Sequence, residues 1–394
     1  MSEILEYVDP VEGFTGWLVY DRTSARMAAG GCRMQPGLTA RTLSSLAARM
    51  TLKQRVLGIS VDGAKCGVDY DPAAPGAPAA MERFLAFLRE QLMTRFSMGC
   101  DMGTRFDELD AAARRLGIPS IKYAIKSAQG LSDDEFFARF RLLDAPAGAL
   151  TLGERRAGHA VGHAALAAAR AAGLTGRISV SLQGFGNLGR AAAYTLAEEG
   201  AAFGAVADQF ACVAGPDDTG LDMKTMLAAR NGSRVTDTAP DAAALPADAV
   251  FTRPCDVLVL AAAENAMTPE QAERLPASVV VVGANNGLSE PVERALHARG
   301  VLVVPDFIGG IGGSASMEAL FGPERIATPQ YTLDLIAAMM HDLTGRLIST
   351  SRLENTLVRE VAERQAMQET AADAVGGTRA YGNSPLLARA LSVV

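Results

Sequence analysis

The spacing of apolar residues in the first part of the chain predicts short strands mixed with helices. Apolar runs predict strands at residues 16–20 and 59–61. Apolar residues three and four positions apart predict helices over residues 41–55, 81–92 and 107–116. This part is therefore expected to form an α/β domain.

From residue 154 onward the pattern changes to strands that alternate with helices. An alanine-rich helix is predicted over residues 154–172, and long helices over residues 332–349 and 354–370. Between them, buried strands are predicted at residues 177–182, 202–207, 257–262, 279–283 and 301–304. Such alternation is typical of a parallel sheet. The predicted fold class is α/β with two domains: an N-terminal α/β domain and a Rossmann-type, doubly wound dinucleotide-binding domain.

Composition and charge exclude several classes of function. The 394 residues, 49% apolar and 21% charged, fit a globular protein of two domains. A net charge of −7 gives no attraction to nucleic acid or to an anionic membrane. The chain also has no run of 18 apolar residues, the length that a membrane-spanning helix needs. Five scattered cysteines form no CxxC pair, and no carboxylate or cysteine joins His159 and His163 in a metal signature, so no metal site is expected. These features predict a cytoplasmic protein without nucleic-acid or membrane partners.

A glycine-rich turn provides the strongest functional motif. Residues Gly184–Gly189 match GxGxxG, with an apolar strand before them and a helix after them. The first glycine permits the tight turn, the second lets backbone N–H groups approach a pyrophosphate, and the third allows the helix to pack closely. The positive end of that helix suits a diphosphate. The cofactor-binding residues predicted in the turn are Gly184, Phe185, Gly186, Asn187, Leu188 and Gly189.

Asp208 ends the next predicted strand and indicates which dinucleotide is bound. A carboxylate at this position accepts hydrogen bonds from the adenosine ribose and repels a 2′-phosphate. The chain has no Lys or Arg between Arg190 and Lys224 that could bind such a phosphate. The sequence therefore favours NAD as the cofactor, with NADP as the alternative.

Three further charged residues stand isolated among apolar residues and glycines: Lys53, Lys65 and Asp101. Buried lysines are rare, whereas most lysines are simply solvated. The residues alone therefore leave open whether these three are catalytic or structural.

The segments that carry these residues resemble the glutamate/leucine/phenylalanine/valine dehydrogenase family of amino acid dehydrogenases. The first segments in the family order are Gly30-Gly-Cys-Arg-Met34, Met50-Thr-Leu-Lys53, Gly63-Ala-Lys65 and Asp101-Met-Gly-Thr104. The later ones are Gly184–Gly189, Ala261–Asn265, Gly283–Asn286 and Val304–Phe307. The resemblance extends from about residue 13 to residue 350.

The resemblance implies a role for each matching residue. Lys53 would bind the substrate α-carboxylate, Lys65 would polarise the keto oxygen and the attacking water, and Asp101 would shuttle protons to the amino group. Gly31 would belong to the substrate site. The residues implied beside the cofactor are Ala262, Asn265 and Asn285. The chemistry suits these residue types, because a carboxylate needs a fixed cation and a desolvated lysine can lose its proton.

Two positions indicate the class of substrate side chain. Family members that act on glutamate hold its side-chain carboxylate with a lysine at the position of Ala29 and a serine at that of Met317. Burying a carboxylate without such partners would cost on the order of several kcal/mol. Ala29 and Met317 would instead line an apolar pocket, which predicts a branched or aromatic side chain. Ordinary core packing explains Met317 equally well.

Three departures from the family pattern leave other reactions open. Asp62 replaces a glycine near Lys65, where it either stabilises the charged lysine or points away. Gly310 replaces an asparagine that holds the substrate, and the threonine near the nicotinamide amide falls at about Arg155. The favoured interpretation is an NAD-dependent amino acid dehydrogenase. The alternatives are a dehydrogenase of the same fold with a modified or non-amino substrate, and an NAD-binding protein of low turnover.

The resemblance also assigns a role to each part of the chain. Residues 1–150 are expected to form a substrate-binding, catalytic and oligomerisation domain, and residues 151–330 an NAD-binding Rossmann domain. Residues 331–394 are expected to be helices that return toward the first domain. A small-molecule substrate is expected between the domains, and the chain is expected to form a homo-oligomer.

Overall fold

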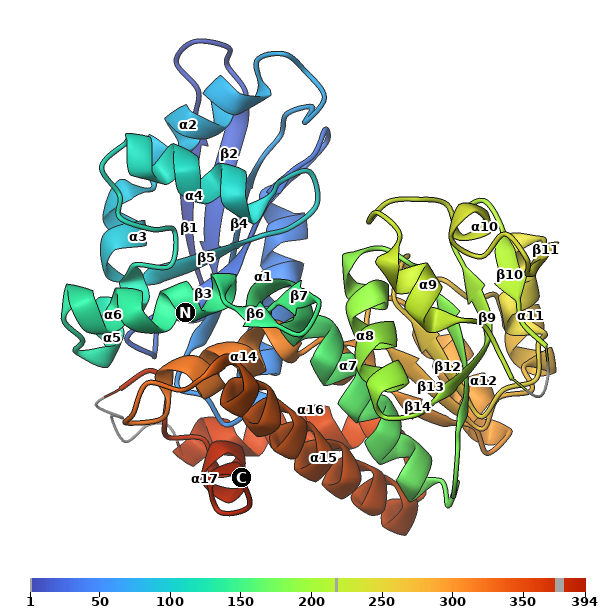
Figure 1. Cartoon of the computed structure of the whole chain (residues 1–394). Coiled ribbons are helices and arrows are strands. Elements are labelled where there is room, and N and C mark those ends of the chain that lie inside the picture. Colours follow the sequence, from blue (N-terminus) through green and yellow to red (C-terminus); the bar gives the residue numbers. More distant parts are fainter. Residues whose placement is uncertain (1, 217–218, 373–378) are drawn as a thin grey trace. The chain divides into compact units, whose positions relative to one another are not determined.

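The structure is a computed structural model that describes residues 2–216, 219–372 and 379–394. The chain divides into two units, each built around its own sheet (Figure 1). The first unit contains the described residues of 1–140, 321–324 and 366–385. The second contains those of 141–320, 325–365 and 386–394.

The first unit has a five-stranded mixed sheet in the order β1-β2-β4-β3-β5. Strand β3 is parallel to both β4 and β5, whereas β2 is antiparallel to both β1 and β4. The strands are β1 (Glu3–Val8), β2 (Thr15–Tyr20), β3 (Ala28–Met34), β4 (Asp62–Val68) and β5 (Phe96–Cys100). The predicted strand at residues 59–61 therefore begins later, at Asp62.

Helices cover both faces of this sheet. They are α1 (Ala40–Val56), α2 (Ala77–Phe87), α3 (Arg89–Thr94), α4 (Phe106–Arg115), α5 (Ala124–Gln129) and α6 (Asp133–Phe140). Apolar residues of α2 and α4, such as Phe84 and Leu109, pack on one face, and Leu43 and Ala47 of α1 pack on the other. The helix predicted over residues 81–92 is two helices, because the chain leaves helical geometry at Leu88.

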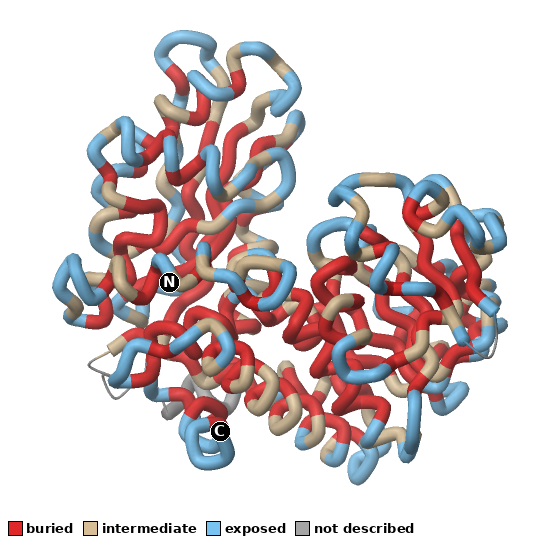
Figure 2. The backbone as a smooth tube through the Cα atoms, viewed as in Figure 1, coloured by how far each residue is buried: buried red, intermediate tan, exposed pale blue. Residues whose placement is uncertain are grey.

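The second unit has a seven-stranded sheet in the order β11-β10-β9-β8-β12-β13-β14. Strands β9, β8, β12, β13 and β14 are parallel, and β10 and β11 form an antiparallel edge. The strands are β8 (Ser179–Gln183), β9 (Ala202–Ala207), β10 (Cys212–Ala214), β11 (Ala243–Leu245), β12 (Val257–Leu260), β13 (Val279–Val282) and β14 (Leu302–Val304). Figure 2 shows the central strands as buried, which explains their uniformly apolar sequences.

The remaining elements lie around this second sheet and in the C-terminal part of the chain. The helices are α7 (Leu152–Ala171), α8 (Asn187–Glu198), α9 (Met223–Ala228), α10 (Val235–Thr238), α11 (Pro269–Arg274), α12 (Glu290–Ala298), α13 (Asp306–Gly309), α14 (Gly312–Phe321), α15 (Pro329–Glu354), α16 (Val358–Ala372) and α17 (Pro385–Leu391). Two short strands, β6 (Pro146–Ala147) and β7 (Leu150–Thr151), form a hairpin before α7. Thr151 and Glu154 cap α7 reciprocally, which fixes where this helix begins. In the described part of the chain, every helix is too short or too polar to cross a membrane.

Candidate active site

Three charged side chains converge in the first unit. Nζ of Lys65 lies 2.8 Å from Oδ2 of Asp101, and the same oxygen accepts a hydrogen bond from Nε of Arg33 at 3.0 Å. The exposed fractions of the Lys65, Asp101 and Arg33 side chains are only 7%, 12% and 8%. A carboxylate shielded from water between two cations can hold and transfer a proton. The structure thus brings the predicted catalytic pair, Lys65 and Asp101, into direct contact.

The sheet explains why these side chains meet. Lys65 lies in β4 and Asp101 follows β5, and β3 runs between these two strands. Gly31 of β3 leaves the space for the pair, because a Cβ at Gly31 would lie 3.1 Å from both Nζ of Lys65 and Cβ of Asp101. Gly31, which the sequence placed in the substrate site, therefore borders both side chains.

Arg33 is a residue of this cluster to which the sequence interpretation gave no role. Burial alone would raise the pKa of Asp101, but the Lys65 ammonium and the Arg33 guanidinium outweigh it and hold the pKa of this carboxyl below its usual range. Asp101 is thus kept as an anion. Arg33 stands in a strand that is buried throughout, and because that burial is visible only in the structure, no local sequence signal revealed its role.

Two more polar residues lie near the glycines of this sheet face. Ser97 of β5 is directly opposite Ala29 of β3, and its buried hydroxyl has no hydrogen-bond partner among the described residues. Lys122 is buried, with Nζ 3.7 Å from the place that a Cβ of Gly99 would take. Lys53, the predicted carboxylate ligand, is buried near the end of α1. The sequence interpretation had singled out only Lys53 and Ala29 of these residues.

The glycine turn of the second unit fits a dinucleotide phosphate. Gly184 has φ +99°, and a Cβ there would lie 2.5 Å from Cβ of Ala262. A Cβ at Gly189 would lie 1.8 Å from the carbonyl oxygen of Gly184, so only glycine lets α8 begin this close to the turn. Gly186 has no atom within 4 Å of its Cβ position, which leaves backbone N–H groups at the start of α8 open to an anion.

The other predicted cofactor residues follow neighbouring parallel strands. The turn comes directly after β8, at the point where the strand order reverses between β8 and β12. The predicted cofactor residues that are exposed along this edge are Gly186, Asn187, Ala262, Asn265 and Asn285. Phe185 is buried beneath the guanidinium of Arg190, and Leu188 packs near Gly283, so these two support the turn. The edge after β8, β12 and β13 is thus a continuous backbone surface of the kind that binds dinucleotides.

Asp208 lies at the end of β9 with its carboxylate already held by the backbone. Oδ1 accepts hydrogen bonds from the N–H groups of Phe210 and Ala211 at 2.7 and 2.9 Å, and Oδ2 accepts one from Val235 at 2.9 Å. The neighbouring Arg234 lies over the ring of Phe210, with 4.5 Å from its guanidinium carbon to the ring centre. The fold therefore places a cation near Asp208 that the local sequence does not reveal.

Family models match most of the chain. The model described as "Glutamate/Leucine/Phenylalanine/Valine dehydrogenase" matches residues 153–375, and "Glu/Leu/Phe/Val dehydrogenase, dimerisation domain" matches residues 4–116. The chain belongs to the Glu/Leu/Phe/Val dehydrogenase family. It is therefore an NAD(P)-dependent amino acid dehydrogenase, an oxidoreductase that acts on the CH–NH2 group.

Individual relatives agree with this assignment. A glutamate dehydrogenase of Aeropyrum pernix is 27% identical over 77% of this chain and 70% of its own length. An NADP-specific glutamate dehydrogenase of Saccharolobus shibatae is 26% identical over 76% of this chain and 69% of its own. Among solved structures, the hetero-hexameric glutamate dehydrogenase of Thermus thermophilus, in its Leu-bound form, shares the fold. Its TM-score is 0.73 at 24% identity, over 95% of this chain and 88% of that one.

Two departures from the family pattern have structural explanations. Asp62 points away from Lys65: its carboxylate accepts hydrogen bonds from Ser24 at 3.1 Å and from the backbone N–H of Ala25 at 2.7 Å, and it pairs with Arg55 at 3.4 Å. Gly310 has no room for a side chain, because a Cβ would lie 2.5 Å from the carbonyl oxygen of Gly283.

The third departure, Arg155, also has a structural explanation. Arg155 is buried, pairs with Glu198 of α8 and lies over the ring of Tyr194. Arg155 therefore joins α7 to α8.

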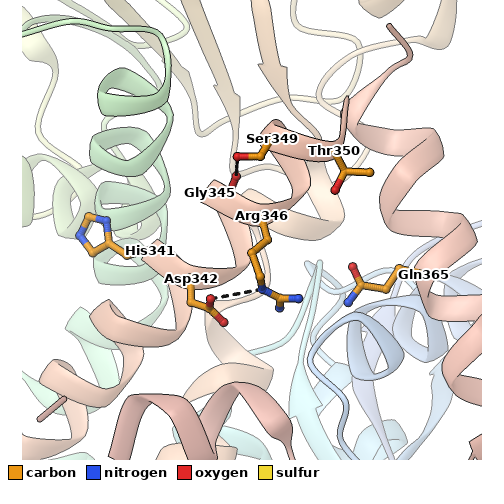
Figure 3. Close-up of a pocket in the computed structure, with 7 residues that line it drawn as sticks. All are labelled: His341, Asp342, Gly345, Arg346, Ser349, Thr350 and Gln365. Atoms are coloured by element: carbon orange, nitrogen blue, oxygen red, sulfur yellow. Dashed lines mark hydrogen bonds and ion pairs between the residues drawn. The ribbon is translucent and has the colours of Figure 1, made fainter. Parts of the chain in front are cut away.

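A cavity of about 470 Å³ in the second unit is lined by none of the predicted site residues. Its lining residues are His341, Asp342, Gly345, Arg346, Ser349, Thr350 and Gln365 (Figure 3). Asp342 and Arg346 form an ion pair along one side, at 3.2 Å. Met317, the second residue proposed for the substrate side chain, is buried in α14 of this unit. Among the described residues, no three His, Cys, Asp or Glu side chains are grouped as metal ligands would be.

Proposed function

We propose that this dehydrogenase oxidatively deaminates an L-2-amino acid to the 2-oxo acid with NAD, and catalyses the reverse reductive amination. The observation that carries the proposal is the buried contact between Lys65 and Asp101, with Arg33 on the same carboxylate oxygen. Deamination requires proton transfer at nitrogen and at the attacking water, and a buried lysine–carboxylate pair provides both a donor and an acceptor.

The proposed mechanism assigns a separate task to each residue. Lys53 binds the α-carboxylate, and Asp101 accepts a proton from the amino group. Lys65 activates the water that attacks the α-carbon once the hydride has left. When bound, the nicotinamide would supply the acceptor for that hydride. Arg33 stabilises the anionic form of Asp101 throughout, which prevents Asp101 from taking up a proton from solvent at neutral pH.

Gly31→Ala is expected to lower kcat by about 100-fold, because its methyl group would push Lys65 and Asp101 apart and a displacement of about 1 Å has an effect of this size. Gly99→Ala is the matched control. Gly99 lies opposite Gly31, but a Cβ there would make only ordinary contacts, at 3.7 Å from Nζ of Lys122 and 3.8 Å from the carbonyl oxygen of Gly30. Steady-state rates of the two variants check this, with melting temperatures to detect unfolding. Equal rates for both would contradict the assigned role of Gly31.

Arg33→Gln is expected to move the acidic limb of the pH profile of kcat/KM upward by about one pH unit. Arg33 and Lys65 lower the pKa of Asp101. Removing Arg33 therefore raises this pKa, so that Asp101 becomes protonated and inactive at a higher pH than in the wild type. Arg33→Lys, which keeps the charge, is expected to restore most of the profile. An unmoved acidic limb in Arg33→Gln would show that Asp101 is not the titrating group.

The class of substrate side chain has two candidates. Ala29 and Met317 favour an apolar branched or aromatic side chain, because neither can compensate a buried carboxylate. The second candidate is an acidic side chain, favoured by buried Lys122 on the sheet face of Gly99 and by the unpartnered hydroxyl of Ser97.

Oxidation of a panel of leucine, valine, phenylalanine, tryptophan, glutamate and aspartate, followed by NADH absorbance, distinguishes these classes. The first candidate predicts the highest kcat/KM among the four apolar substrates. A preference for glutamate or aspartate that is lost in Lys122→Met would establish the second.

We also propose NAD as the preferred cofactor, on the basis of Asp208. Relatives include both NADP-specific and NAD-specific enzymes, and Arg234 would attract a 2′-phosphate. NADP is therefore expected to be used as well, less efficiently. Arg234→Gln should lower kcat/KM with NADP by about tenfold and leave that with NAD unchanged. An equal effect on both cofactors would argue against a role for Arg234 in selectivity.

A homo-oligomer is proposed for the assembled enzyme. The match of residues 4–116 to a dimerisation domain supports this, and the hetero-hexameric Thermus protein supports assembly of several subunits. Light scattering of the purified protein measures the mass directly.

A further inference from the structure

A buried ion cluster in the second unit joins α16 to α12 and to the start of α13. Nε of Arg359 lies 2.7 Å from a carboxylate oxygen of Glu293 in α12, and Nη2 of Arg359 lies 3.0 Å from Oδ1 of Asp306 at the start of α13. The exposed fractions of the Arg359, Glu293 and Asp306 side chains are 17%, 1% and 3%. We call these three residues the Arg359 cluster.

The cluster continues into the backbone at the edge of the sheet. Oδ2 of Asp306, the oxygen that does not face Arg359, accepts a hydrogen bond from the N–H of Asn286 at 2.9 Å. The carbonyl oxygen of Asn286 in turn accepts one from the N–H of Asn265 at 2.8 Å. One continuous chain of contacts thus runs from Arg359 to the loop after β13 and on to the loop after β12.

Both asparagines at the end of this chain have a backbone conformation that must be held in place. Asn286 has φ +56° and Asn265 has φ +47°, in the left-handed region that side chains other than glycine seldom adopt. These two loops carry Asn285 and Asn265, which the family resemblance places beside the cofactor, with Asn285 near the nicotinamide. The pyrophosphate is expected at Gly186 and the adenosine ribose at Asp208, and no described contact of the Arg359 cluster reaches either residue.

We propose that Arg359 is a positioning residue for the nicotinamide half of the dinucleotide. This inference rests on the proposed role of the second unit in binding the cofactor. Arg359 neutralises and orients Asp306, Asp306 accepts a hydrogen bond from the N–H of Asn286, and this fixes both loops in the geometry that receives the nicotinamide ring. Without Arg359, Asp306 and Glu293 would be two buried carboxylates without their shared cation, and Asp306 would be free to turn away from Asn286.

The test compares a ligand that has the nicotinamide ring with one that lacks only this ring. NADH affinity is measured by fluorescence titration, and ADP-ribose affinity by calorimetry. In Arg359→Met, the Kd of NADH is expected to rise about tenfold, the effect of losing a charge-assisted hydrogen bond, whereas the Kd of ADP-ribose stays within about twofold. Arg359→Lys is expected to recover most of the NADH affinity. Glu293→Gln is the matched control, because it removes the other carboxylate and leaves the contact between Arg359 and Asp306 in place.

A purely structural role for Arg359 would change both affinities together or neither, and either result would overturn the inference. If Arg359→Met does not fold, Asp306→Asn weakens the next link in the same chain, and the same selective loss of NADH affinity is expected. If the wild type binds neither NADH nor ADP-ribose, the proposed function is overturned, and this inference with it.

Discussion

Lys65→Ala is expected to lower kcat/KM for amino acid oxidation by about 1000-fold or more, because it removes a proton donor and acceptor at the reacting centre. The variant is expected to remain folded. Asp101 would still be paired with Arg33 at 3.0 Å, so no buried carboxylate is left without a cation. Steady-state kinetics measure the loss, and NADH titration should give an unchanged affinity because the glycine turn lies in the other unit.

Lys126→Ala is the matched control for this experiment. Lys126 also forms an ion pair with an aspartate in the first unit, at 2.8 Å from Asp133, but both partners are partly exposed to solvent. Its replacement is expected to change kcat/KM by less than about twofold, since exposed ion pairs contribute little. A Lys65→Ala enzyme that keeps a tenth or more of wild-type activity would remove Lys65 from the mechanism.

The free energy of unfolding is expected to fall steeply as the pH drops below about 6.5, the ordinary pKa of histidine. Three of the four histidines of the chain are packed together between α7 and α15. Nδ1 of His163 lies 3.2 Å from Nε2 of His341, and the rings of His159 and His163 are 4.3 Å apart. Burial lowers the pKa of His159 to about 4, of His163 to about 3 and of His341 to about 4.

The sign follows from proton binding in the two states. Well above pH 6.5 these histidines are neutral in both the folded and the unfolded chain, so their burial costs no protonation free energy. Between pH 6.5 and about 4 the unfolded chain binds protons that the folded chain excludes, so stability is lost as the pH falls. His159 and His163 together contribute about 3 kcal/mol per pH unit in that window. Urea unfolding at a series of pH values measures the slope.

Two single variants test the assignment of this slope to the cluster. His163→Gln is expected to remove about one proton from the slope, whereas His297→Gln, at the fourth histidine outside the cluster, is expected to leave it unchanged. An identical slope in the wild type and His163→Gln would contradict the account.

The sequence alone predicts those structural features that one contiguous segment determines. The turn Gly184–Gly189 was predicted because strand, turn and helix are contiguous, and Gly184 has the positive φ that the motif demands. The parallel strands of the second sheet were predicted for the same reason, as apolar runs between helices. By contrast, β3 was not predicted, because its sequence, AAGGCRM, has two glycines, a charged residue and no β-branched residue, and so lacks the apolar run of a buried strand.

Residues that depend on a distant partner could not be assigned from the sequence. Arg33 stands in a recognised segment, but its partner Asp101 is 68 positions away. Arg234 lies near Asp208 only because the fold brings the backbone of the neighbouring Val235 to the Asp208 carboxylate. Arg359 contacts Asp306, which is 53 positions away in the sequence. In each case a charged residue is paired by tertiary packing, which periodicity and short motifs do not encode.

The ammonia dependence of NADH oxidation with a 2-oxo acid tests the central claim most directly. If Lys65 and Asp101 carry out amination, NADH oxidation should rise and saturate with ammonia, and one 2-amino acid should form for each NADH consumed. NADH oxidation that proceeds equally well without ammonia and yields a 2-hydroxy acid would contradict the account.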